Sequence, residues 1–412
     1  MKKTVTLTIP EGAEHISEAF GIQDGYVREI FNLEEPEFQS ILYITGESGS
    51  GKSTILNEFY EETKVSFDES KPIFSLIDNE PMKWLSFVGL GDAVLYVTPF
   101  KYLSDSQQKR FIILKMILEN DIIVVDEFLS TLDRKTAKSV AFTFQKLIRK
   151  LNKRAVVATA HDDLTDYLMP SVKIHGKAFP SKFETTRYIE GEFPNPFQEV
   201  EFEYVDKDYY RNLSLGELHY RGKYTGGTKE YLIAKFNNET IGVLVSTNLI
   251  GREGRRISRV VVHPSYRGCG IGKAIVERYI DDYPLTEVIA VMAKYNPVFD
   301  KAGMIRVDDS IVKSPPRLKS SLKELDFNFK KWHDLNYCNQ VASDRKFREK
   351  LSEFSKHAKK YVQPGGRHLE TEEIAMKIKS EPYTAGRVLW QFREKKYAKY
   401  ITKKMWRKRN EN

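Results

Sequence analysis

The residues with the clearest chemical meaning lie between Gly46 and Ser53, where the sequence reads Gly-Glu-Ser-Gly-Ser-Gly-Lys-Ser. This spacing lets a glycine-rich backbone direct its N–H groups at a phosphate chain. Lys52 is expected to reach the terminal phosphates, and the Ser53 hydroxyl is a ligand for Mg²⁺. The pattern predicts a nucleoside triphosphate site with these binding residues: Gly46, Gly49, Gly51, Lys52, Ser53 and Thr54.

The segments on either side of this loop are those that a phosphate-binding loop needs. Residues 41–44 are mostly apolar and predict a buried strand, and residues 55–60 begin an amphipathic helix. A chance run of glycine and serine does not explain both flanks. We therefore expect a strand, a loop and a helix, with the phosphate at the helix N-terminus.

Two carboxylates follow a second apolar strand, at Asp126 and Glu127. Asp126 is expected near Ser53, where it would complete the ligands of Mg²⁺, and Glu127 is placed to polarise the water that attacks the γ-phosphate. His161 ends a third apolar strand, residues 155–160, and would touch the same phosphate. Acidic residues end many strands, but the order of these residues along the chain favours triphosphate hydrolysis.

Residues 1–180 resemble ABC-type ATPases. The resemblance rests on the loop at 46–53, on the second strand with its carboxylates, on Leu-Ser-Asp-Ser-Gln at 103–107, on the segment 130–133 and on His161. These correspond to the Walker A, Walker B, signature, D-loop and switch-histidine motifs of that family.

The resemblance implies ATP and Mg²⁺ as cofactors, with Ser53 and Asp126 on the metal. In the family, the signature of one protomer closes over the ATP of another. A homodimer through the ATPase domains is therefore implied, in which Ser104 and Gln107 bind ATP. Ser104 also opens a predicted helix whose dipole suits a γ-phosphate.

Several residues depart from the family pattern. Asp105 and Ser106 replace the two signature glycines, Phe128 replaces the usual proline, and no glutamine occurs between residues 54 and 103. The same interval is too short for the helical arm that grips a membrane domain. We expect slow turnover or use of ATP as a switch, and no membrane partner.

A second glycine-rich segment, the glycine-rich turn at 267–272, reads Arg-Gly-Cys-Gly-Ile-Gly. A strand over 257–262 precedes it and a helix from Lys273 follows, so backbone amides again face a pyrophosphate at a helix N-terminus. No Walker lysine and serine accompany it. With the His263-Pro264 step, the combination resembles the GNAT acetyltransferase family over about residues 198–310.

That resemblance implies acetyl-CoA or another acyl-CoA as the donor. A family tyrosine that protonates the leaving thiolate has Phe299 at its matching position, and Tyr295, about one helical turn earlier, is the candidate in its place. Glu287 is a candidate general base. The implied acyl-CoA-binding residues are Val261, Val262, Arg267, Gly268, Gly270, Ile271, Gly272 and Lys273.

The last quarter of the chain carries the positive charge. Residues 311–412 have 26 Lys and Arg against 12 Asp and Glu, whereas the rest of the chain is net negative. The pattern is mainly helical, with cations and the aromatics Phe392, Tyr397, Tyr400 and Trp406 interleaved near its end. This composition favours contact with nucleic acid, with an anionic membrane surface, a solvated helical surface or a packed helix stripe as alternatives.

The sequence thus predicts an α/β protein with a P-loop ABC-type ATPase domain (1–180), a linker (181–197), an α/β GNAT domain (198–310) and a basic, mostly helical region (311–412). Two cysteines and no predicted membrane segment favour the cytoplasm.

The whole chain resembles ABC-ATPase–GNAT fusions associated with phages and mobile elements, through residues 88–91, 126–128 and 161–170. The predicted function is ATP-regulated acyl transfer to a nucleic acid, either DNA or tRNA. Two alternatives stay open. One is an acetyltransferase for protein or small-molecule amines with an ATPase switch, and the other is a non-acetylating ATP-dependent nucleic-acid clamp.

Overall fold

The structure is a computed structural model that describes residues 2–32, 34–177, 182–189, 191–218, 229–249, 251–290, 297–312, 316–328, 330–331, 334–359, 370–380 and 395–410. The chain divides into two compact units. The first consists of residues 1–222, 230–245 and 259–279, and the second of residues 223–229, 246–258 and 280–412.

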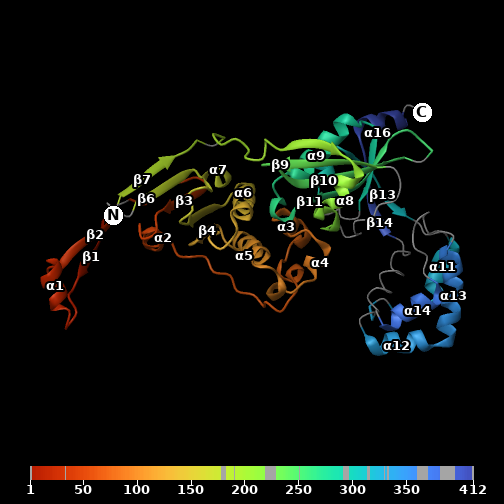
Figure 1. Cartoon of the computed structure of the whole chain (residues 1–412), viewed down its shortest axis with the longest axis horizontal. Coiled ribbons are helices and arrows are strands. Elements are labelled where there is room, and N and C mark those ends of the chain that lie inside the picture. The colour runs from red at the N-terminus through yellow and green to blue at the C-terminus, as the bar shows by residue number, and fades with distance from the viewer. Residues whose placement is uncertain are drawn as a thin grey trace. The chain divides into compact units, whose positions relative to one another are not determined.

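The first unit contains a five-stranded sheet in the order β4–β5–β3–β6–β7 (Figure 1). All its strands are parallel except the last: β4 (Ile122–Val125), β5 (Arg154–Ala158), β3 (Ile41–Gly46), β6 (Val172–Lys177) and the antiparallel β7 (Lys182–Arg187). Every residue of β3 is buried, as expected for a parallel strand covered on both faces. The strand that leads to His161 therefore lies between the P-loop strand and the strand that leads to Asp126.

Helices connect these strands: α2 (Lys52–Phe59), α3 (Pro81–Phe87), α4 (Ala93–Tyr96), α5 (Asp105–Glu119), α6 (Arg134–Lys150) and α7 (Thr165–Leu168). Short 3₁₀ helices occur at Ile73–Leu76 and Phe100–Tyr102. The apolar residues at 73–77 predict a strand by their types alone. The segment turns instead because the Ser75 N–H and hydroxyl both donate to the Pro72 carbonyl, at 2.9 and 2.8 Å.

An N-terminal hairpin precedes the sheet. It pairs β1 (Lys2–Leu7) with β2 (Tyr26–Asn32) in antiparallel fashion, with α1 (Glu14–Phe20) between them. Threonine alternates with apolar residues at positions 4–9, a pattern typical of a strand, and β1 covers the first part of it.

The first unit continues with neighbouring strands in the order β11–β10–β9–β8. Their bounds are β8 (Glu201–Val205), β9 (Lys229–Phe236), β10 (Glu239–Asn248) and β11 (Arg255–Val262), and β10 and β11 contribute residues to both units. Asn237 and Asn238 have φ of 50° and 62°, values that suit a tight hairpin turn between β9 and β10. The remaining helices are α8 (Lys207–Asn212), α9 (Ile271–Asp282) and the 3₁₀ turns Ser214–Leu218 and Pro264–Tyr266.

The second unit contains a strand that the sequence pattern did not indicate. The beginning of β11 pairs in parallel with β12 (Thr286–Ala290), and β14 (Lys395–Ile401) pairs antiparallel with both β12 and β13 (Ile305–Val312). The spacing of Tyr397, Tyr400 and Ile401 had suggested a helical stripe. The segment is extended because two strands at least 80 residues away in sequence supply its hydrogen bonds.

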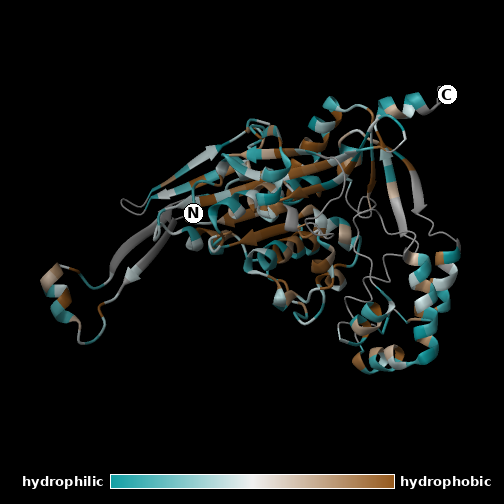
Figure 2. Cartoon of the chain, turned by 45° about the vertical axis from the view of Figure 1, so that its right-hand side comes forward, coloured by the Kyte–Doolittle hydropathy of each residue, from teal (hydrophilic) through white to brown (hydrophobic). Residues whose placement is uncertain are grey.

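Most other described residues of the C-terminal region are helical: α10 (Val298–Lys301), α11 (Pro316–Glu324), α12 (Leu335–Ser343), α13 (Arg345–Lys359), α14 (Thr371–Ser380) and α16 (Lys403–Asn410). α11 to α14 enclose a core of Leu318, Cys338, Leu351, Phe354 and Ile378. Polar and apolar residues alternate along these helices (Figure 2). The predicted fold class is confirmed, and no described helix is long and apolar enough to cross a membrane.

Candidate functional site

The loop between β3 and α2 has the shape of a phosphate cradle. Gly46 has a φ of 135°, and a Cβ atom there would lie 2.0 Å from the Gly176 carbonyl oxygen, so only glycine fits. The Lys52 ammonium donates to the carbonyls of Gly46 and Glu47, at 3.0 and 2.7 Å. Burial lowers the pKa of Lys52, and the neighbouring Asp126 carboxylate opposes this shift. The lysine therefore lies within the curl of the loop and close to the Asp126 carboxylate.

The other predicted residues of this loop line the same opening. Gly49 and Gly51 have φ of 77° and 91°, and Gly51 is the residue before the first turn of α2. Ser53 is exposed and Thr54 is half-buried in that turn. Together with Lys52, these residues fit a triphosphate.

The turn after β4 holds Glu127 in a strained conformation. Its φ is 46°, a left-handed value that is uncommon for a residue with a Cβ atom. The Glu127 N–H donates to the Asp126 carboxylate at 2.8 Å, and the Phe128 N–H donates to the Ala158 carbonyl of β5 at 2.8 Å. Phe128 is buried against Phe144 of α6, with ring centres 4.9 Å apart. Glu127 itself stays exposed at the end of the strand, as a catalytic carboxylate requires.

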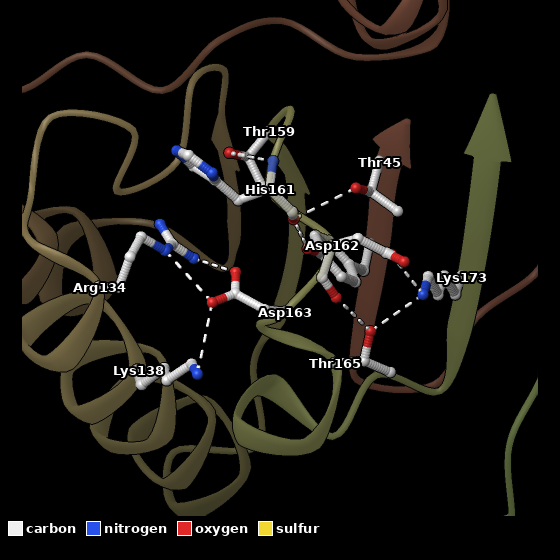
Figure 3. Close-up of polar contacts among 10 residues, drawn as sticks. Thr45, Arg134, Lys138, Thr159, His161, Asp162, Asp163, Thr165 and Lys173 are labelled. Carbon is white, nitrogen blue, oxygen red and sulfur yellow. Dashed lines mark hydrogen bonds and ion pairs between the residues drawn. The ribbon is translucent and has the colours of Figure 1, made fainter. Parts of the chain in front are cut away.

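The backbone of His161 is fixed by the P-loop strand (Figure 3). Its carbonyl accepts hydrogen bonds from the Tyr43 hydroxyl and, at 3.2 Å, from the Thr45 hydroxyl, and both donors lie on β3. Its N–H donates to the Thr159 hydroxyl at 3.3 Å. These contacts hold the half-buried histidine beyond the carboxyl end of β5, between the strand that leads to Lys52 and the strand that leads to Asp126.

Asp163 connects the histidine loop to the first turns of α6 (Figure 3). Its carboxylate accepts from two nitrogens of Arg134 and lies 3.4 Å from the Lys138 ammonium. Burial would raise the pKa of Asp163, but these two cations hold it below its usual value. Because α6 follows the segment 130–133 directly, these contacts connect the predicted D-loop to the loop that carries His161.

The predicted signature residues begin α5. The Ser104 N–H donates to the Gln107 side-chain oxygen at 3.1 Å, which is half of a capping box. Ser104 and Asp105 are exposed at this helix N-terminus.

The glycine-rich turn has one packed position and one open position. Gly268 and Gly270 have φ of 85° and 95°. A Cβ atom at Gly268 would lie 2.7 Å from the Phe87 carbonyl oxygen and 2.8 Å from a methyl carbon of Thr143, whereas one at Gly270 would meet no atom within 4 Å. The first part of the turn is therefore packed against the ATPase region, and the second part faces solvent.

The other predicted acyl-CoA residues lie around the open part. Val261 and Ile271 are buried, Val262 and Gly272 are half-buried, and Lys273 is exposed. The Arg267 guanidinium donates to the Val262 carbonyl at 3.1 Å and pairs with Asp92. Arg267 is thus already bound to protein groups.

Tyr295 lies outside the described residues, so its role stays a prediction. Phe299 is buried, with its ring centre 5.6 Å from that of Tyr400.

Glu287 has the contacts of a structural anchor. It is 0% exposed and pairs with Arg252 at 2.7 Å, Arg256 at 2.5 Å and Lys399 at 3.2 Å. Burial would raise the pKa of Glu287, but Arg256 and Lys399 hold it below its usual value of 4.5. A carboxylate with a lowered pKa and three cationic partners is a poor general base at neutral pH.

Replacing Glu287 with glutamine should destabilise the protein by about 3 kcal/mol, because the three cations lose their partner while the half-exposed arginines regain some water. The stabilisation by Glu287 should be complete above about pH 4.5 and be lost as the pH falls through its lowered pKa. Chemical denaturation at neutral and acidic pH measures both effects. Glu353→Gln, on an exposed surface pair, is the control and should change stability by about 0.5 kcal/mol or less. Equal stability of Glu287→Gln and wild type would contradict the anchor role.

The sequence interpretation missed Arg110, which joins the two predicted sites. Its position was informative, since Arg110 shares the spacing of Ile113, Leu114 and Ile117 on the buried stripe of α5. An arginine in such a stripe is rarely buried unless it has partners.

A metal at the P-loop would rely on Ser53, Asp126 and phosphate oxygens. Among the described residues, no group of three or more His, Cys, Asp or Glu side chains is suited to hold a metal ion. Mg²⁺ at phosphate sites commonly uses only one or two protein ligands with waters and phosphates, so these residues fit it.

Comparison with known families confirms the predicted GNAT domain. Residues 186–296 match the acetyltransferase (GNAT) family. No curated protein matches the chain.

The similar solved structures include ABC cassettes. The ATP-binding cassette MJ0796, a dimer bound to ADP and Pi, is 17% identical, covers 45% of this chain and 97% of that chain, and has a TM-score of 0.31. cbiO1 from Clostridium perfringens, part of the ABC transporter complex cbiONQ, is 17% identical, covers 40% of this chain and 81% of that chain, and has a TM-score of 0.29. TM-scores this low do not support an ATPase function for this chain. The ATPase hypothesis therefore depends on the strand order and the P-loop contacts of the chain itself.

Proposed function

We propose that this protein is an ATP-regulated acyltransferase that uses acyl-CoA and modifies a nucleic acid. Mg²⁺ and ATP bind at the P-loop of one copy, under Ser104 and Gln107 of a second copy in a homodimer. Acyl-CoA binds at the open part of the glycine-rich turn. The observation that carries this proposal is the packing of that turn against two helices of the ATPase region.

Arg110 of α5 makes the first connection. It is 3% exposed, and it donates to the Val88 carbonyl at 3.0 Å and to the Ser265 carbonyl, just before the turn, at 3.3 Å. The pKa of Arg110 is lowered to about 10, mainly by burial. The nearby Arg267 guanidinium adds to the lowering, whereas Cys269 and Asp133 oppose it. One buried guanidinium thus bridges the helix that begins at Ser104 and the segment that enters the turn.

α6 makes the second connection. The Thr136 hydroxyl donates to the Ser265 hydroxyl at 3.1 Å, and the Lys146 ammonium donates to the Gly268 carbonyl at 3.2 Å. Cys269 is buried, with its sulfur 3.8 Å from the Ser139 carbonyl oxygen. α5 begins next to Ser104, a predicted contact with ATP, and α6 begins immediately after the segment 130–133, which resembles the D-loop.

This arrangement gives ATP a physical route to the acyl-CoA site. A close-packed contact transmits a displacement of α5 or α6 instead of absorbing it. Any effect of ATP on acyl-CoA affinity must be matched by an equal effect of acyl-CoA on ATP affinity. Because Asp105 and Ser106 replace the signature glycines, we favour a switch over rapid hydrolysis.

The transferase chemistry is acyl transfer from a thioester to an amine. The amine nitrogen bonds to the carbonyl carbon, the carbon–sulfur bond breaks, and the CoA thiolate leaves and takes up the proton that the amine loses. Tyr295 is the predicted proton donor to the thiolate. In the predicted ATPase region, Glu127 is the proposed residue that polarises the attacking water, and His161 is proposed to contact the γ-phosphate.

We propose a nucleic acid as the acceptor because residues 311–412 carry a net positive charge. The resemblance to phage-type fusions favours DNA over tRNA. A cytoplasmic location agrees with these substrates.

ATP should change the acyl-CoA dissociation constant at least about fivefold, the lower end of typical allosteric coupling. Arg110→Met, which keeps side-chain bulk but removes the donors, should reduce this ratio to near one while each ligand still binds alone. Calorimetric titration of acyl-CoA with and without ATP measures the ratio.

Two further variants make this test specific. Asp92→Asn weakens the ion pair between Asp92, in the predicted ATPase region, and Arg267. This variant should also reduce the ratio of the acyl-CoA dissociation constants with and without ATP. Arg187→Met removes an arginine that donates to a different backbone carbonyl, that of Glu37, and should leave the ratio unchanged. A wild-type ratio of one would overturn the regulatory proposal.

A further inference from the structure

We propose that the second unit binds single-stranded nucleic acid on one basic surface, formed by residues 251–256, which are a loop and the start of β11, and by helix α16. This inference deepens the proposed function by placing the acceptor polymer. The surface consists of Arg252, Arg256, Lys403, Lys404, Trp406 and Arg407, and we refer to it as the α16 surface.

Several contacts hold the loop and α16 side by side. The Lys408 ammonium pairs with the Glu253 carboxylate at 2.7 Å. Met405 of α16 is buried in a cluster with Leu249 and Ile401. A Cβ atom at Gly254 would lie 3.1 Å from the Met405 methyl group. These contacts hold the two basic segments next to each other.

Glu287 orients the arginines of this surface. Arg252 and Arg256 share its carboxylate with Lys399, so three cations surround one anion. The side chains of Arg252 and Arg256 are 45% and 44% exposed, and each remains open to a second anion on its outer side. A guanidinium held in place loses less conformational entropy when it binds a phosphate.

α16 adds further cations and an exposed ring. Lys403, Lys404 and Arg407 are exposed on a helix without acidic residues. Trp406 is 44% exposed, whereas Tyr400, another aromatic of the predicted stripe, is buried and donates to Asp300 at 2.9 Å. An exposed indole among cations suits stacking on an unpaired base, which a duplex does not offer.

The same residues disfavour an anionic membrane as the partner. A helix that lies on a membrane inserts an apolar face between the headgroups. In α16, Met405 faces the protein core, and Trp406 is the other large apolar side chain of this helix. The α16 surface thus has the charge to meet phosphates but no apolar face to enter lipid.

The first test removes two cations. Lys404→Gln with Arg407→Gln should weaken binding to a fluorescent single-stranded oligonucleotide about tenfold at ~50 mM salt, and it should reduce the slope of log affinity against log salt by about 1.4, the value for two phosphate contacts to a single strand. Lys346→Gln with Lys350→Gln removes the same charge from exposed positions of α13 and is the matched control, which should keep wild-type affinity and slope. Equal losses in the two double variants would overturn the proposal.

The second test addresses the ring. Trp406→Ala should weaken single-strand binding about tenfold, whereas Trp406→Phe should retain most of the affinity and duplex binding should change little. Thermal unfolding of each variant checks that the fold is retained. Binding to anionic phosphatidylserine vesicles but not to oligonucleotides would overturn the assignment in favour of a membrane.

These measurements need neither ATP nor acyl-CoA. The α16-surface variants could lose oligonucleotide binding while ATP has no effect on acyl-CoA affinity. This result would overturn the regulatory proposal and support the α16 surface. If ATP changes acyl-CoA affinity but these variants keep wild-type oligonucleotide binding, the regulatory proposal is supported and the α16 surface is overturned.

Discussion

Replacing Lys52 with alanine is expected to abolish ATP binding, with a loss of affinity of at least about a hundredfold, since two charge-assisted hydrogen bonds contribute about 3 kcal/mol or more. The Lys52 ammonium already lies inside the curl of the P-loop, 2.7 Å from the Glu47 carbonyl oxygen. When a triphosphate is bound, the same ammonium can exchange these carbonyls for phosphate oxygens. Fluorescence titration with an ATP analogue measures the loss.

A matched control is Lys71→Ala, which removes a lysine that is 60% exposed from the same unit. It should bind ATP as the wild type does. Lys52→Ala should still bind acyl-CoA in the absence of ATP, because the glycine-rich turn keeps its contacts with α5 and α6. Unchanged ATP affinity in Lys52→Ala would remove the basis for an ATPase site.

Replacing Gly270 with aspartate is expected to abolish acyl-CoA binding, again by at least about a hundredfold. Its φ of 95° strains any residue with a Cβ atom. The added carboxylate would also stand where the backbone amides are expected to meet a pyrophosphate, and it would repel that anion. ATP binding should be retained. A Cβ atom added at Gly270 would meet no atom within 4 Å, so the substitution should not disturb the packing around the P-loop.

Gly191→Asp is the matched control for this change. Gly191 has a φ of 89° and equally open surroundings, so the strain is comparable and only the position differs. Acyl-CoA titration by calorimetry should separate the two variants. Equal acyl-CoA affinity in Gly270→Asp and wild type would contradict the assignment of the turn.

The local motifs were predictable because each depends on residues that are close in sequence. The strand, loop and helix around Lys52 and the turn at 267–272 have glycines and apolar flanks that fix their geometry. The hairpin at Asn237 and Asn238 is of the same kind, since asparagine tolerates a positive φ.

What the sequence did not reveal depends on distant partners. Lys395–Ile401 is compatible with a helix or a strand by spacing, and β12 and β13 decide that it is β14. In the sequence, Arg110 is one charged residue in a helix. Its role depends on hydrogen bonds to the carbonyls of Val88 and Ser265, which lie 22 and 155 residues away. The role of Glu287 likewise depends on three cations from two segments, residues 251–256 and β14, that are far apart in sequence.

The central claim is that one chain transfers an acyl group to nucleic acid under the control of ATP. The most direct measurement is mass spectrometry of nucleosides after DNA or RNA is incubated with the full-length protein and acetyl-CoA, with ATP, with ADP or with no nucleotide. We expect acetylated nucleosides whose yield depends on ATP, and none with Gly270→Asp. Release of free CoA with no modified nucleoside would move the acceptor to a protein or small-molecule amine. Absence of both CoA release and modified nucleosides under every nucleotide condition would contradict the account.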